Sequence, residues 1–143
     1  MGFWLPGMLI TASRLDRDTK QVKDTTARTV TSTTYGNGSS ALSTTILGPP
    51  SGQLEVTVEA RVDHASGTNV LSSFTASGST SGTLYTPIDA EATQWASTSS
   101  AGPMATSQVF SCLPGEVVTI TAVHRVTSGT GNMRYRSLKV RQL

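Results

Sequence analysis

The sequence predicts an all-β protein, an antiparallel β-sandwich or jelly roll of about seven or eight strands with an extended N-terminal arm. Three observations lead to this prediction. Serine and threonine supply 42 of the 143 residues, and their side chains disfavour helices by competing for backbone hydrogen bonds. Several segments alternate between apolar and polar residues, which is the period of a half-buried strand. Turn residues separate these segments at roughly ten-residue intervals, a spacing typical of sandwiches and jelly rolls.

The chain is predicted to divide at residue 42 into an N-terminal segment, 1–41, and a β-sandwich domain, 42–143. Within the first part, Pro6-Gly7 is a turn signal, and residues 12–20 are predicted to form one or two helical turns. The polar stretch 17–40 is predicted to be an arm that links the opening to the sandwich, with a candidate short strand at 29–34.

The strands of the sandwich are predicted in order from alternation and from the turns between them. The clearest is QLEVTVEARV, in which apolar residues occupy every second position from Leu54 to Val62. The apolar positions of the last strand change parity between Tyr135 and Leu138, so we expect a β-bulge near Ser137. The predicted strands span residues 42–47, 53–62, 70–77, 83–88, 93–96, 104–111, 116–126 and 133–143. No segment is long enough for a crossover helix, which excludes a parallel α/β fold.

Composition narrows the range of functions. Charged residues make up 14% of the chain and the net charge is +2, against roughly 25% charged residues in ordinary domains, so the balance does not indicate a nucleic-acid partner. The single cysteine, Cys112, excludes a disulfide framework. The opening has no basic residue before its apolar stretch, which is too short for a signal peptide or a bilayer span. We therefore expect a protein made in the cytoplasm, with no membrane partner.

The two histidines are weak candidates for catalysis. Asp63-His64 resembles half of a catalytic dyad, but adjacent strand residues point to opposite faces, and no nucleophile elbow is present. A polar strand end entering a turn is the better interpretation. His124 lies within a predicted strand, where a satisfied, partly buried histidine is favoured over a metal ligand, because no second ligand has suitable spacing.

The carboxylates do not form a recognisable site either. Glu55 and Glu59 share the outer face of one strand about 13 Å apart, more than a glycosidase pair requires. Asp89 and Glu91 lie in a loop without the dense pattern of a calcium site. We therefore predict no catalytic residue, no metal and no cofactor.

Two groups of residues are candidates for binding. The last hairpin is basic, but it has no interleaved aromatic residues, and charged strand edges also prevent aggregation; we predict no nucleic-acid partner. Tyr85 and Trp95 are a candidate sugar-stacking pair, with packing in the core or at a subunit interface as the favoured alternative. The residues that make the last hairpin basic are Arg125, Arg134, Arg136, Lys139 and Arg141.

The opening of the chain is the strongest candidate for a docking segment. Its bulky apolar side chains can supply several buried anchors to a partner surface. The predicted anchor residues are Phe3, Trp4, Leu5, Pro6, Gly7, Met8, Leu9, Ile10 and Leu15.

This opening, WLPGMLITASRLD, resembles the start of small virion proteins of tailed phages, especially phages of actinobacteria. Those chains often begin with an aromatic residue, Pro-Gly, two variable residues, an aliphatic residue, Thr-Ala, two more residues and Leu-Asn. Asp16 stands where asparagine is usual, and the matching positions are Pro6, Gly7, Ile10, Thr11, Ala12 and Leu15. Residues 49–62, 113–126 and 138–143 are also similar to the terminal β domain of those proteins.

The resemblance implies a non-enzymatic structural protein of the virion: a minor tail protein, a head fibre or a capsid decoration protein. It further implies attachment through the N-terminal segment to other capsid or tail proteins, and a homo-oligomer, with a trimer favoured. One alternative is a carbohydrate-binding module at a tail tip that recognises a host cell-surface glycan through Tyr85 and Trp95. A small hydrolase is the third hypothesis.

Overall fold

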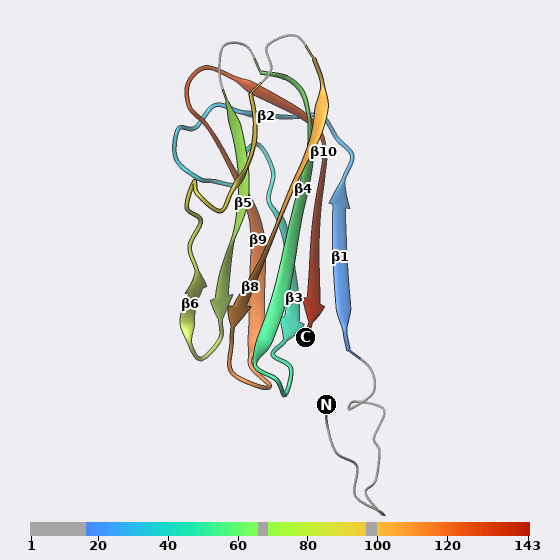
Figure 1. Ribbon diagram of the computed structural model, residues 1–143, viewed down its shortest axis with the longest axis vertical. Helices are drawn as coiled ribbons and strands as arrows, with labels where there is room; N and C mark the ends of the chain where they lie inside the picture. Colours follow the sequence, from blue (N-terminus) through green and yellow to red (C-terminus); the bar gives the residue numbers. More distant parts are fainter. Residues whose placement is uncertain (1–16, 66–68, 97–99) are drawn as a thin grey trace, which may run out of the picture.

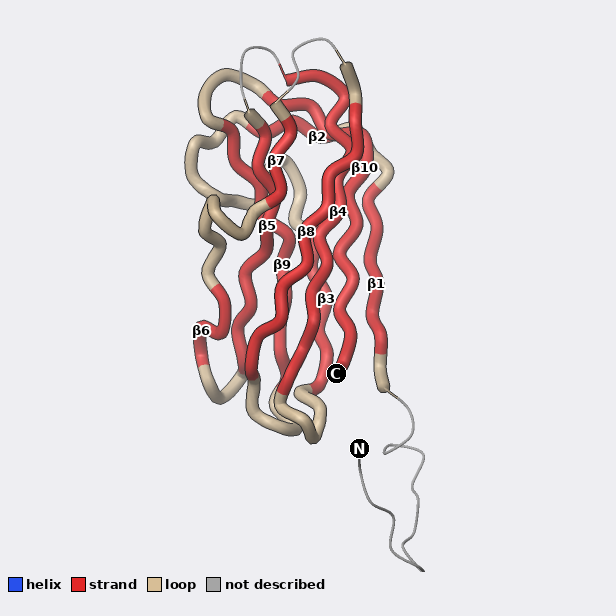
Figure 2. Tube along the Cα trace, in the orientation of Figure 1, coloured by secondary structure: helices blue, strands red, loops and turns tan. Residues whose placement is uncertain are grey.

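The computed structural model describes residues 17–65, 69–96 and 100–143, and it shows a β-sandwich (Figure 1). These residues form ten strands and no helix (Figure 2). The strands make two antiparallel sheets that pack against each other. The predicted fold class is therefore confirmed, with more strands than the seven or eight expected.

Each sheet contains five strands. One, here called the β4 sheet, has the order β1-β10-β4-β8, with β2 also paired to β10. The other, the β5 sheet, has the order β3-β9-β5-β6, with β7 also paired to β5. The strands are β1 (Thr19–Asp24), β2 (Arg28–Val30), β3 (Leu42–Leu47), β4 (Gln53–Ala65), β5 (Val70–Gly78), β6 (Gly82–Tyr85), β7 (Thr93–Trp95), β8 (Gly102–Ser111), β9 (Val117–Val126) and β10 (Gly131–Gln142).

Alternation identified the strands of the sandwich well. β3 spans the predicted residues 42–47, and in β4 the side chains of Leu54, Val56 and Val58 are fully buried. These positions face the other sheet because successive strand residues point to opposite faces. The predicted strands after residue 42 all exist, with ends that differ by a few residues.

The predicted arm needs correction. β1 and β2 both pair with β10, so two parts of the 17–40 stretch are strands of the β4 sheet. Val30, in β2, is only 1% exposed and belongs to the core. The sandwich therefore begins at Thr19 rather than at Leu42. Thr19 and Lys20 are extended, which also corrects the helical turns predicted at 12–20 as far as the structure describes that stretch.

The predicted bulge near Ser137 is also wrong, because the irregularity lies closer to the start of β10. Met133 pairs with Val62 and Tyr135 pairs with the preceding residue of β4, Arg61. Arg134 is thus the extra residue of the bulge. Beyond it the even-numbered positions face inward, and Arg136, Leu138 and Val140 are buried.

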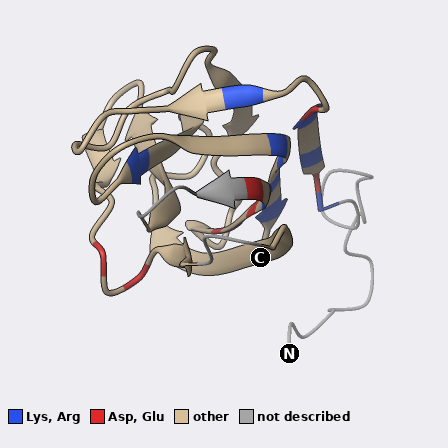
Figure 3. Cartoon of the chain, turned by 90° about the horizontal axis from the view of Figure 1, so that it is seen from above, with Lys and Arg blue, Asp and Glu red and all other residues tan. Residues whose placement is uncertain are grey.

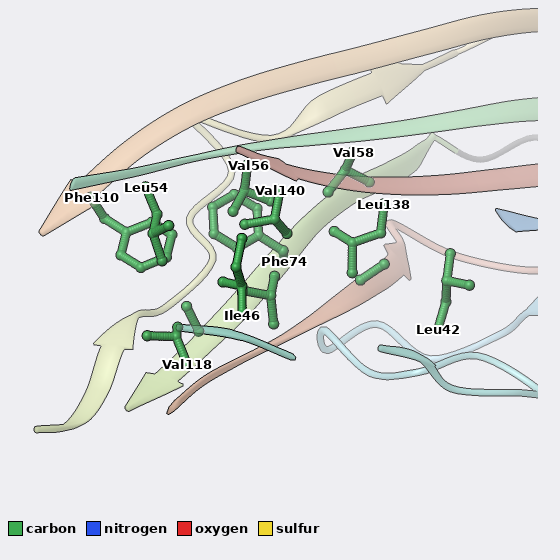
Figure 4. Close-up of a cluster of buried hydrophobic side chains, with 13 residues drawn as sticks. Leu42, Ile46, Leu54, Val56, Val58, Phe74, Phe110, Val118, Leu138 and Val140 are labelled. Atoms are coloured by element: carbon green, nitrogen blue, oxygen red, sulfur yellow. The ribbon is translucent and has the colours of Figure 1, made fainter. Parts of the chain in front are cut away.

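The core contains two clusters of buried side chains. The larger one is centred on Phe74, which lies 6.0 Å from Phe110 between ring centroids (Figure 4). The ring of Phe74 also stacks on Tyr85 at a centroid distance of 4.3 Å. The smaller one includes Val30 and Met133, with Trp95 packed against it. Burial of each large apolar side chain contributes roughly 1.5–3 kcal/mol, so the two clusters together hold the sheets face to face.

Candidate functional site

The chain enters the sandwich at one end, which we call the entry pole and define as residues 17–19, 47–53, 112–117 and 141–143. The backbone N–H of Asp18 donates to Oε1 of Gln142 at 3.0 Å, and the N–H of Gln142 donates to the carbonyl of Asp18 at 3.1 Å. Nε2 of Gln142 also donates to the carbonyl of Leu47 at 2.9 Å. The start of the described chain is thereby held beside its C-terminus.

Three large apolar side chains are exposed at the entry pole. Leu47, Leu113 and Val117 are 56%, 48% and 45% exposed. Leu47 and Val117 are directly paired across β3 and β9. Leu113 belongs to the adjoining loop, where its carbonyl lies so close to Gly48 that a Cβ there would be 2.1 Å from it. The pole therefore presents apolar surface next to the point where residues 1–16 join the sandwich.

Glu116 links the entry pole to the turn between β5 and β6 through hydrogen bonds. Its carboxylate is buried and accepts hydrogen bonds from the backbone N–H of Leu113 at 2.7 Å, from the N–H of Ser81 at 3.1 Å and from the Ser81 hydroxyl at 3.0 Å. The bond from Leu113 is the largest cause that lowers the pKa of Glu116 below its usual range, despite burial. The bond from Leu113 closes the loop before β9 and the bonds from Ser81 join that loop to the turn after β5, so this carboxylate has a structural role.

The predicted anchor residues lie outside the described residues. Phe3, Trp4, Leu5, Pro6, Gly7, Met8, Leu9, Ile10 and Leu15 all precede Arg17, where the description begins. Their role in docking remains a prediction.

The candidate catalytic residues are held in structural contacts. Asp63 forms an ion pair with Arg134 at 2.8 Å; the side chain of His64 is outside the described part. His124 is fully buried, and its Nδ1 shares a hydrogen bond of 2.7 Å with the hydroxyl of Ser72. Burial is the main cause that lowers the pKa of His124 to about 3, with the positive charge of Arg136 adding to it. This imidazole is therefore neutral and sealed from solvent at ordinary pH.

The two loop carboxylates are engaged as well. Asp89 pairs with Arg125 and accepts a hydrogen bond of 2.9 Å from the hydroxyl of Tyr35. Glu91 accepts a hydrogen bond of 2.6 Å from the hydroxyl of Tyr85. These contacts fasten the loop after β6 over the β5 sheet.

Tyr85 and Trp95 do not meet. Both strands that carry them pair with β5, Tyr85 opposite Ala76 and Trp95 opposite Val70. Six residues along a strand correspond to about 20 Å. Tyr85 packs in the larger core cluster and Trp95 against the smaller one, so the two rings do not form one platform.

The basic residues of the last two strands are distributed rather than gathered. Figure 3 shows blue segments on several strands and not on a single face. Four of the five are neutralised by ion pairs: Arg125 with Asp89, Arg134 with Asp63, Arg136 with Asp24, and Arg141 with Glu55.

Arg136 is the residue whose position the sequence pattern missed. The bulge at Arg134 turns it inward, and its side chain is 1% exposed. Its Nη2 lies 2.6 Å from Oδ2 of Asp24, and its Nη1 donates to the carbonyl of Asn37 at 3.2 Å. Arg28 donates to the same carboxylate oxygen at 2.9 Å, and the hydrogen bonds from Arg28 and then Arg136 hold the pKa of Asp24 far below its usual range. The arginine thus ties the end of β1 and the loop between β2 and β3 to the sandwich.

A hollow of about 510 Å³ lies on the outer face of the β4 sheet. In the register of that sheet, Glu59 lies opposite Ala105, and Arg61 lies between Pro103 and Tyr135. The hollow exists because small side chains on β8 adjoin long ones on β4. It is lined by Glu59, Ala60, Arg61, Pro103, Met104, Ala105 and Tyr135.

The comparisons with known proteins do not assign the chain to a family. No protein-family model matches it, and no curated protein shows significant similarity to it. Across the described ranges, no His, Cys, Asp and Glu side chains form a group of three that could hold a metal ion. The same ranges contain no helix long and apolar enough to cross a membrane.

Proposed function

We propose that this protein is a non-enzymatic structural protein of a tailed-phage virion, attached to the particle through residues 1–16 and displaying its β-sandwich outward. The observation that carries the proposal is the apolar surface of Leu47, Leu113 and Val117 at the entry pole, beside the point where the opening segment joins. Such surface is typical of a protein–protein contact. The resemblance of the opening to phage virion proteins supports the same role.

The arrangement of the sandwich supports a division between an attached end and a displayed end. The exposed apolar side chains belong to the entry pole, where the described chain begins at Arg17, so one end of the domain would be buried in the particle. The partners would be other capsid or tail proteins, together with further copies of this chain in a homotrimer. Light scattering of the full chain tests the trimer, which should have three times the 15.0 kDa mass of one chain.

The test of attachment is deletion of residues 1–16. The truncated protein should stay folded, because β1 begins at Thr19 and the buried apolar residues of the described core run from Val30 to Val140. It should no longer be incorporated into particles, as measured by its copy number per virion. The full chain with Lys139→Gln, a change at an exposed site on β10, serves as the control and should be incorporated normally.

Two results would contradict the proposal. Loss of folding in the truncated protein would place the opening in the core. Normal incorporation would place the attachment site elsewhere. With the full chain, a copy number in the hundreds indicates capsid decoration, and a few to a few dozen copies indicate a tail or baseplate protein.

A further inference from the structure

The hollow on the β4 sheet contains three polar side chains that the fold does not use. Within the described residues, Glu59, Arg61 and Tyr135 have no hydrogen-bond or ion-pair partner in the protein. Every other carboxylate described has such a partner: Asp18, Asp24, Glu55, Asp63, Asp89, Glu91 and Glu116. Among the described residues, the one carboxylate without such a partner therefore lies at this hollow, together with an unpaired guanidinium and an unpaired phenol.

The bulge in β10 brings Tyr135 to this hollow. Because Arg134 is the extra residue, Tyr135 lies opposite Arg61 on the outer face while Met133 remains in the core. Bulges commonly redirect a side chain next to a binding site. Here the bulge adds a half-buried aromatic ring to a hollow already flanked by a carboxylate and a guanidinium.

The chemistry of the three groups indicates an uncharged, polyhydroxylated ligand. A carboxylate only accepts hydrogen bonds and a guanidinium only donates them, so a ligand that fits both must offer donors and acceptors. Glu59 and Arg61 are two residues apart on one strand face, a spacing of about 7 Å, and their charges cancel. The tyrosine ring adds an apolar surface with a polar tip. A sugar ring has hydroxyls around its rim and an apolar C–H face.

Shape and position agree with such a ligand. A volume of about 510 Å³ lies within the usual range of roughly 300–1,000 Å³ for small-molecule sites. Arg61 is eight residues along β4 from Gln53 at the entry pole, a separation of about 26 Å, so the hollow lies well away from the proposed attached end.

We propose that the hollow between Glu59, Arg61 and Tyr135 binds an uncharged saccharide, with the ring of Tyr135 against the sugar face and the two charged side chains on its hydroxyls. This proposal goes beyond the structural role, and it replaces the Tyr85–Trp95 pair as the location for glycan binding. On a displayed domain, the site would recognise neutral sugars of a cell surface.

Titration of the full chain by NMR tests the proposal, with the methyl glycosides of glucose, galactose, mannose and N-acetylglucosamine as probes. At least one glycoside should bind saturably and weakly, because the hollow is open to solvent. Tyr135→Ala should weaken that binding about tenfold through loss of the ring contact. Lys139→Gln, which removes a charge from the same sheet face outside the hollow, should leave it unchanged.

The double variant Glu59→Gln with Arg61→Gln keeps the test decisive if Tyr135→Ala perturbs the fold. Both residues are exposed and unpaired, so the double variant should melt like the wild type and bind the glycoside several-fold more weakly. The proposal is overturned if no glycoside binds saturably, if these variants bind as tightly as the wild type, or if zwitterionic glycine binds in place of the glycosides. Particle incorporation of Tyr135→Ala separates this test from the structural role, since that variant should be incorporated normally.

Discussion

Replacement of Asp24 by alanine is expected to destabilise the protein strongly. The carboxylate is the charged partner of Arg136, whose side chain is 1% exposed, and the two are joined at 2.6 Å. Without Asp24, the guanidinium stays buried with one neutral contact, the carbonyl of Asn37. Since a buried charge without its counter-ion is very unfavourable, we expect loss of this contact to release the end of β1 and the loop between β2 and β3 from the sandwich.

The magnitude follows from the burial of the pair. Removing one member of a buried ion pair costs about 3–5 kcal/mol, and we expect the lower end because the Asp24 side chain is 13% exposed. For a domain of this size, about 3 kcal/mol lowers the melting temperature by roughly 6–12 °C. Native proteins in general have an unfolding free energy of about 5–15 kcal/mol, so this loss would be a large part of the total.

Urea denaturation at pH 7 measures this loss, with two matched variants for comparison. Arg28→Ala removes the other cation on the same carboxylate. Because the side chain of Arg28 is 26% exposed, we expect this variant to lose about 0.5–1 kcal/mol of unfolding free energy. Arg136→Met removes the buried charge itself and should cost less than Asp24→Ala. Equal losses in Asp24→Ala and Arg28→Ala would refute the reasoning, because they would show that burial of Arg136 does not set the energy.

Two further predictions concern the core. The unfolded chain binds a proton at His124 below its ordinary pKa of 6.5, whereas the folded protein does so only near pH 3; stability should therefore fall as the pH drops between these values, by about 1.4 kcal/mol per pH unit. Denaturation of His124→Gln at pH 7 and pH 5 checks this, and a pH dependence equal to that of the wild type would contradict it. Gly102→Ala should cost about 1–3 kcal/mol, because a Cβ there would lie 1.8 Å from the ring of Trp95. Gly36→Ala, where a Cβ has open space, is the control in thermal melting, and equal melting temperatures would disprove the steric argument.

Local patterns predicted most of the strands because a strand's period is itself local. In β4, the alternation of buried Val56 and Val58 with polar neighbours is visible in the letters alone, and the all-β class follows from several such segments. β1 escaped this reasoning because it is a short edge strand with few apolar residues, and the candidate strand at 29–34 overlaps β2 only in part. Their identity depends on β10, more than a hundred residues away in the chain.

The sequence by itself determined that the chain forms an antiparallel sandwich and where most of its strands lie, since burial of one strand face requires a pattern that neighbouring residues carry. Only the tertiary structure decided which side chains meet. A single extra residue, Arg134, sends Arg136 into the core toward Asp24 and Tyr135 outward beside Arg61. Pairing with different parts of β5 in one sheet likewise separates Tyr85 from Trp95. Register and bulges are set by contacts between distant strands, and a shift of one residue reverses the face of every side chain beyond it.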